Sequence, residues 1–215
     1  MPFDYKSGFK IGVGTNFGHD HWDSYAGYTW LHGKDTARAS VNPSEKAIIP
    51  LLGPPSLFAT SISTFATGNV QWSLKMDFGD LDLGRRYYLG THLLFRPAIG
   101  IRGAWIRQNR DATFVSAPTS VPSGTALIHQ NWYSWGVGPR GSLNTQWQLG
   151  KGFSLYGIGA VDLLYTRYTN MKETGSVVSS SGDLLSNIGV NQKLDMLRTH
   201  LELELGLDSV SYTHL

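Results

Sequence analysis

The chain has 215 residues, with 18 Lys or Arg against 16 Asp or Glu, which gives a formal net charge of +2. Charged residues make up only 16% of the chain and aromatic residues 12%, with 25 glycines and no cysteine. This composition excludes a disordered chain, which would be richer in charge, and a disulfide scaffold. The small basic excess also argues against a dedicated nucleic-acid binder.

The first part of the chain shows a two-residue hydrophobic period. Apolar residues alternate with polar residues or glycine over Phe9–Phe17, Trp22–Trp30 and Val70–Phe78. Such alternation predicts half-buried β-strands. The apolar positions change phase near Gly79, and we expect a β-bulge there that keeps one apolar face.

The second part continues the same period in longer stretches. These are Leu93–Arg107, Asn131–Gln148, Phe153–Tyr165 and Leu197–Leu207. No run of about 18 apolar residues occurs, so a membrane helix is not expected. About seven strands result, most of ten residues or more, and a membrane-crossing strand needs about 9–11. The sequence therefore predicts an all-β, antiparallel up-and-down transmembrane β-barrel.

The links between these strands alternate between short and long. The short links are Gly18–His21, Gly90–His92 and Leu149–Gly152. Outer-membrane barrels join their strands in this way, with tight periplasmic turns and long external loops. The long links are rich in Ser, Thr, Pro and Gly, so we expect them to be solvent-exposed loops. They cover approximately Lys34–Asn69, Asp111–Gln130 and Thr169–Asn191.

The polar face of the predicted strands carries both signs of charge. In a barrel these side chains would line a water-filled lumen and set its selectivity. Two alternatives stay open: the solvated face of a soluble sandwich, and a lumen plugged by internal ion pairs. The predicted pore-lining residues are Lys10, Asp23, Lys75, Asp77, Asp82, Arg86, Arg96, Arg102, Arg140, Asp162, Arg198, His200, Glu202 and Glu204.

Large aromatic residues on the apolar face lie near the predicted strand ends. Aromatic girdles of this kind sit at the two interfaces of a membrane. The predicted girdle residues are Trp30, Trp105, Tyr133, Trp147, Phe153 and Tyr165.

Motifs for chemistry are weak. Gly136–Gly141 matches G-x-G-x-x-G, but Ser142–Trp147 continues as a strand where a nucleotide site needs a helix, so close packing explains these glycines better. His19-Asp20-His21 is interpreted as a polar turn and not as a metal site. No serine occupies a G-x-S-x-G elbow. We therefore expect no enzyme activity, no cofactor and no metal.

Several blocks together resemble one family, the Legionella-type major outer membrane proteins, over roughly residues 5–208. The resemblance implies a pore-forming β-barrel in the bacterial outer membrane, with passive passage of small solutes and no catalytic residues. The blocks are Tyr5–Gly14, His19–Asp23, Tyr28–His32, Leu81–Tyr88, Leu94–Ile106 and Trp135–Thr145.

Compared with that family, the chain is expected to be a fragment truncated at both ends. Residues 1–208 are interpreted as a partial barrel domain and residues 209–215 as a non-native tail. A seven-stranded piece has two open edges, so we expect this chain alone not to form a closed, stable pore.

The predicted function is passive diffusion of small solutes through a charged lumen. The alternative is an adhesin or surface-binding barrel with long external loops. The expected partners are outer-membrane lipid, small solutes and ions, without nucleic acid, and a homo-oligomer stays open.

Overall fold

The computed structural model contains one antiparallel sheet whose strands follow one another in chain order. It describes residues 7–18, 20–43, 45–50, 57, 64–117, 123–150 and 152–209. The strand order is β1-β2-β3-β5-β6-β7-β8, with β4 paired to β5. This confirms the predicted all-β, up-and-down fold. The strands are β1 (Gly8–Asn16), β2 (Trp22–Ser40), β3 (Thr67–Arg85), β4 (Tyr87–Leu89), β5 (Leu93–Val115), β6 (Gly124–Gly150), β7 (Phe153–Ser179) and β8 (Leu184–Ser209).

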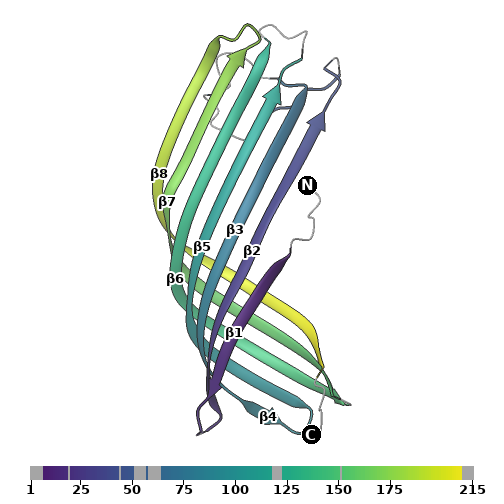
Figure 1. The fold of residues 1–215 in the computed structure, drawn as a ribbon, viewed down its shortest axis with the longest axis vertical. Coiled ribbons are helices and arrows are strands. Elements are labelled where there is room, and N and C mark those ends of the chain that lie inside the picture. The colour runs from purple at the N-terminus through teal and green to yellow at the C-terminus, as the bar shows by residue number, and fades with distance from the viewer. Residues whose placement is uncertain are drawn as a thin grey trace.

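The sheet is strongly curled but not closed. The strands bend near their middle, and in the lower half β1 lies in front of β7 and β8 (Figure 1). Although β1 and β8 do not pair, Lys10 Nζ of β1 lies 3.1 Å from Glu202 and 3.0 Å from Glu204 of β8. The curl therefore brings the two edges of the sheet within reach of one ion-paired cluster.

The short links are tight turns, as predicted, and we call this the short-turn end. Asp20 and His21 have φ of 59° and 58°, and Gly90 has φ of 68°, values that suit Gly, Asn and Asp in hairpin turns. At the same end, β4 continues the pairing of β3 with β5 in the same register. The ladder is interrupted where Arg85 faces Pro97, which has no N–H to donate.

The long links Asp111–Gln130 and Thr169–Asn191 are mostly strand, which corrects the expectation of extended loops there. Strands β5 and β6 continue to Val115 and from Gly124, and β7 and β8 form a hairpin that turns between Ser179 and Leu184. The inward residues nearest the long-loop end, such as Phe114, Ile128 and Val177, are apolar and pack together, which stabilises strand pairing beyond the predicted strand ends. We call this end the long-loop end; it lies at the top of Figure 1.

At the long-loop end the concave face holds a hydrophobic cluster. Leu57 and Phe65, which lie between β2 and β3, are fully buried against the sheet. A Cβ added at Gly175 would stand 2.5 Å from Leu57, so that glycine gives the leucine its room. Part of the segment between β2 and β3 therefore folds inward over the sheet. The buried sheet residues of the cluster are Ala112, Phe114, Ala126, Ile128 and Val177.

The expectation of a β-bulge at Gly79 is wrong. Strand β3 pairs with both β2 and β5 through this position without a register shift. Leu81 therefore shares a face with Asp77, while Asp80 shares the opposite face with Phe78. Each face of β3 therefore changes character at Gly79. One face is apolar up to Phe78 and acidic from Asp80, and the other is polar up to Asp77 and apolar from Leu81.

The convex face carries a continuous apolar band. It spans Leu93–Trp105 on β5, Phe153–Tyr165 on β7 and Leu197–Leu207 on β8, and side chains such as Leu203, 77% exposed, project from it. A strand of about 13 residues rises about 40 Å, and a tilt of about 45° leaves about 28 Å, close to the apolar thickness of a bilayer.

Charged residues on the convex face begin where the band ends. Arg167 lies two residues beyond Tyr165, and its Nε donates to Asp195 at 2.8 Å. That hydrogen bond holds the pKa of Asp195 below its ordinary value. The convex face therefore changes from apolar to charged at the same level on neighbouring strands.

All six predicted girdle residues lie on the convex face. Trp30, Trp105, Tyr133 and Tyr165 lie toward the long-loop end of the band, and Trp147 and Phe153 toward the short-turn end. Since the strands continue beyond the band, most of the first group lie inside strands and not at their ends. Contact of these residues with a membrane interface stays a prediction.

Candidate functional site: charged residues on the concave face

The concave face is built around Arg102 of β5, which is only 4% exposed. Its Nε and Nη2 donate to the two carboxylate oxygens of Asp80 at 2.6 and 2.7 Å. Its Nη1 donates to Asp162 at 2.9 Å, and Nη2 also donates to Glu202 at 2.6 Å. One guanidinium thus joins carboxylates from β3, β7 and β8 and ties the curled sheet together across its interior.

Arg140 of β6 extends this arrangement toward the short-turn end. Its Nη1 donates to Glu202 at 2.9 Å, and its Nε lies 3.7 Å from Asp82. His200 Nδ1 is 2.9 Å from Asp162 on the other side. We call this group the charge cluster: Lys10, Asp80, Asp82, Arg102, Arg140, Asp162, His200, Glu202 and Glu204.

A second ion-paired group lies closer to the short-turn end. Asp23 of β2 accepts from Arg96 Nε at 2.8 Å, and Arg86 Nε lies 3.1 Å from its other carboxylate oxygen. Asp23 and Arg96 are both buried. Such charges are tolerated away from bulk water because each has an oppositely charged partner.

Glycines lie opposite or beside these arginines on neighbouring strands. Gly138 faces Arg102 and Gly100 faces Arg140 across the ladder. A Cβ at Gly84 would stand 2.6 Å from the Arg96 guanidinium carbon. The motif Gly136–Gly141 lies within β6, where Gly136 and Gly138 are closely packed against β7 and support the packing interpretation, whereas Gly141 has open space.

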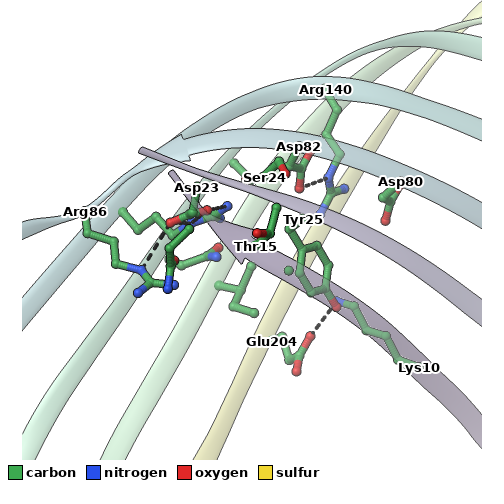
Figure 2. Close-up of a pocket in the computed structure, with 16 residues that line it drawn as sticks. Lys10, Thr15, Asp23, Ser24, Tyr25, Asp80, Asp82, Arg86, Arg140 and Glu204 are labelled. Atoms are coloured by element: carbon green, nitrogen blue, oxygen red, sulfur yellow. Dashed lines mark hydrogen bonds and ion pairs between the residues drawn. The ribbon is translucent and has the colours of Figure 1, made fainter. Parts of the chain in front are cut away.

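Between the two groups lies a polar cavity of about 500 Å³, which we call the lower chamber. Figure 2 shows Asp23 facing Arg86, Asp82 facing Arg140, and Glu204 beside Lys10 around it. Among the described residues, Asp82 Oδ1, Ser142 Oγ and Asn144 Oδ1 have no hydrogen-bond partner. These atoms suit the chamber to water or polar solutes.

The structure gathers all the predicted pore-lining residues on the concave side except two. Lys75 and Asp77 project from the convex face, because β3 has no bulge at Gly79. Asp77 there accepts a hydrogen bond from the Tyr28 hydroxyl at 2.7 Å. Arg198 does lie on the concave side, nearer the long-loop end than the charge cluster, and donates to the Tyr168 hydroxyl at 2.7 Å.

Asp80, the strongest partner of Arg102, is absent from the predicted set. The predicted set names Asp82 but not Asp80, although a bulge at Gly79 would leave both on the polar face. The position of Asp80 two residues before Asp82 was the signal in the sequence, because residues i and i+2 of a continuous strand share one face.

An up-and-down antiparallel sheet with an apolar convex band and a charged concave face defines a protein of the outer-membrane β-barrel class. The chain belongs to the family described as Legionella pneumophila major outer membrane protein precursor, whose model matches residues 1–214. It is therefore an outer-membrane protein of porin-like type, and the family is not one of enzymes. No curated protein matches the chain. In the described part, no helix has the length and apolar character needed to cross a bilayer.

Truncation relative to the family and the non-native tail both stay predictions. Residues 210–215 and His19 lie outside the described residues.

Proposed function

We propose that in the complete barrel, where the two open edges of this sheet are paired, the protein forms a path for passive diffusion of small solutes through the charged lumen. The observation that carries this proposal is the lower chamber bounded by the charge cluster. Charges of both signs line this chamber, and such an arrangement would create a transverse field that orders water and discriminates between ions.

The proposal assigns opposite effects to the two signs of charge beside the lower chamber. Arg96 lines this chamber beside its partner Asp23, and Glu204 borders the chamber with its side chain 33% exposed. Removing the arginine charge favours cations, and removing the glutamate charge favours anions. Both variants change one charge without removing Arg102 from the centre of the cluster.

The test is the reversal potential across a planar bilayer under a KCl gradient, with protein purified from the outer membrane. We expect Arg96→Gln to shift selectivity toward K⁺ and Glu204→Gln to shift it toward Cl⁻. Arg107→Gln is the matched control, because Arg107 lies on the convex face of the same strand as Arg96 and stacks on Tyr133. Absence of conductance, or equal reversal potentials for all three variants, contradicts the proposal.

A second candidate is surface binding by the long-loop end. The observation that favours it is the extension of β5–β8 beyond the apolar band, with its own hydrophobic cluster. Such an extension can present a rigid external surface to a partner. A protein that adheres to cells but does not conduct would favour this candidate over the pore.

A further inference from the structure

A second cavity lies on the concave face, on the long-loop side of the charge cluster. It has a volume of about 540 Å³, within the usual range of small-molecule sites of about 300–1,000 Å³. It lies between β3 and β8, and Phe78 and His200 meet across its floor with ring centroids 6.1 Å apart. We call this cavity the upper chamber.

One wall of the upper chamber is apolar, which is unusual for a barrel interior. Four successive inward positions of β3 are Trp72, Leu74, Met76 and Phe78, and Ile106 of β5 adjoins them. This stripe follows from the absence of a bulge at Gly79, since a bulge would turn these side chains toward the convex face. The wall extends over four alternate residues, enough to bury a short hydrocarbon chain.

The opposite side of the upper chamber presents a cation without a carboxylate partner. Within the described residues, Arg198 of β8 has one hydrogen bond, from Nη1 to the neutral Tyr168 hydroxyl, and no ion pair. A guanidinium carries five N–H donors in a planar fork that matches a carboxylate. Most of the donors of Arg198 are therefore free to bind an anion.

The other charged groups around the chamber are already paired. Arg102 is bonded to Asp80, Asp162 and Glu202, and His200 lies 2.9 Å from Asp162. Glu202, the one carboxylate that lines the chamber, is held by Arg102, Arg140 and Lys10. Its charge is therefore largely neutralised, and Arg198 determines the preference of the chamber for an anion.

A further donor lies in the apolar wall. Trp72 Nε1 is buried and has no hydrogen-bond partner among the described residues. An unpaired buried donor carries a free-energy cost that an incoming acceptor relieves. Trp72 therefore adds a hydrogen-bonding group to the otherwise apolar stripe of β3.

We propose that the upper chamber is a binding site for an anionic amphiphile, a carboxylate on a short hydrocarbon chain, with Arg198 holding the carboxylate and the Trp72–Phe78 stripe covering the chain. This goes beyond solute diffusion, because it requires a saturable site and not a conducting path. Leu201 and Leu203 adjoin the cavity only along the open edge of β8, since their side chains belong to the convex band.

The test measures binding and not conductance, so its outcome is separable from that of the proposed pore. Protein from the outer membrane is placed in lipid nanodiscs, and radiolabelled decanoate is equilibrated against these and against empty nanodiscs. We expect one saturable site per chain above the lipid background. Decanol, which lacks the charge, and acetate, which lacks the chain, should compete at least about 10-fold less well, since charge-assisted hydrogen bonds and buried apolar area each contribute.

Two variants with matched controls assign the site. Arg198→Gln should weaken decanoate binding about 10-fold or more, whereas Arg107→Gln on the convex face should leave it unchanged. Leu74→Ala should also weaken binding, whereas Leu81→Ala, on the convex face of the same strand, should not. Loss of the saturable component in all variants alike, equal competition by decanol, or undiminished binding by Arg198→Gln would overturn the proposal.

Discussion

The charge cluster and the upper chamber are neighbours on the concave face, but they differ in whether their arginine has carboxylate partners. In the cluster, Arg102 is 4% exposed and bonded to three carboxylates. In the chamber, Arg198 faces an apolar wall with only a neutral hydroxyl as partner. Charges that bond one another across the concave face hold the sheet in its curl, while a charge without an ionic partner can bind a ligand.

From this difference we infer that the cluster stabilises the fold and that the chamber binds a ligand. Removing one member of a buried ionic group leaves its partners desolvated and uncompensated, which is strongly destabilising. Removing a cation that has no carboxylate partner leaves no such deficit. Substitutions in the cluster should therefore cost more stability than substitutions in the chamber.

The largest effect on stability is expected for Arg102→Gln. It leaves Asp80 and Asp162 without their guanidinium, and we expect a loss of about 3–5 kcal/mol of unfolding free energy. Urea unfolding of the protein in lipid vesicles measures it. Arg107→Gln on the convex face should cost less than about 0.5 kcal/mol. Equal losses for the two variants would contradict a structural role for the cluster.

A smaller effect is expected for Gly138→Ala, opposite Arg102. A Cβ there would overlap the carbonyl oxygen of Leu163, so the backbone must shift, at a cost of about 1–3 kcal/mol. Gly141→Ala on the same strand is the control, because nothing lies within 4 Å of its added Cβ. The same unfolding measurement applies. If both alanines are equally tolerated, close strand approach does not build the cluster.

Arg198→Gln should cost little stability, about 0.5–1 kcal/mol, because it removes one hydrogen bond to Tyr168. The loss of unfolding free energy should be much smaller than that of Arg102→Gln, although both residues are arginines on the concave face. A loss of unfolding free energy as large as that of Arg102→Gln would mean that Arg198 stabilises the fold as the cluster does. It would argue against a role for Arg198 in ligand binding.

The smallest effect is expected for Trp72→Phe. The indole N–H has no partner, so its removal loses no hydrogen bond, and we expect a change of less than about 1 kcal/mol. Decanoate binding should fall more clearly than stability. A large loss of stability, with binding intact, would show that Trp72 supports the fold and not the site.

The sequence predicted the fold and most of the site because a two-residue period separates the faces of a strand directly. Arg96, Arg102 and Arg140 were placed on one face by that rule alone. The phase of β3 was not predictable, because a bulge at Gly79 and an uninterrupted strand with an apolar lumen stripe give the same alternation. Pairing on both sides of β3 decides between them.

Two other features depend on contacts far apart in the chain. The Ser, Thr and Pro content of the β5 and β6 extensions predicts loops, although Ala126 and Ile128 alternate there and pack against Leu57. Likewise, the ion pair of Arg102 with Glu202 spans β5 and β8. Such partners depend on how tightly the sheet curls, which strand periodicity does not specify.

The most direct test of the proposed lumen is the accessibility of single cysteines along β3 to lipid and to water. The natural chain has no cysteine, so each substitution carries one spin label. Labels at Leu81 and Leu83 should collide with a lipid-soluble paramagnetic reagent, and labels at Met76, Phe78 and Asp80 should not. If labels at Met76 and Phe78 report lipid like those at Leu81 and Leu83, β3 has a bulge at Gly79, and the apolar stripe and upper chamber do not face the lumen.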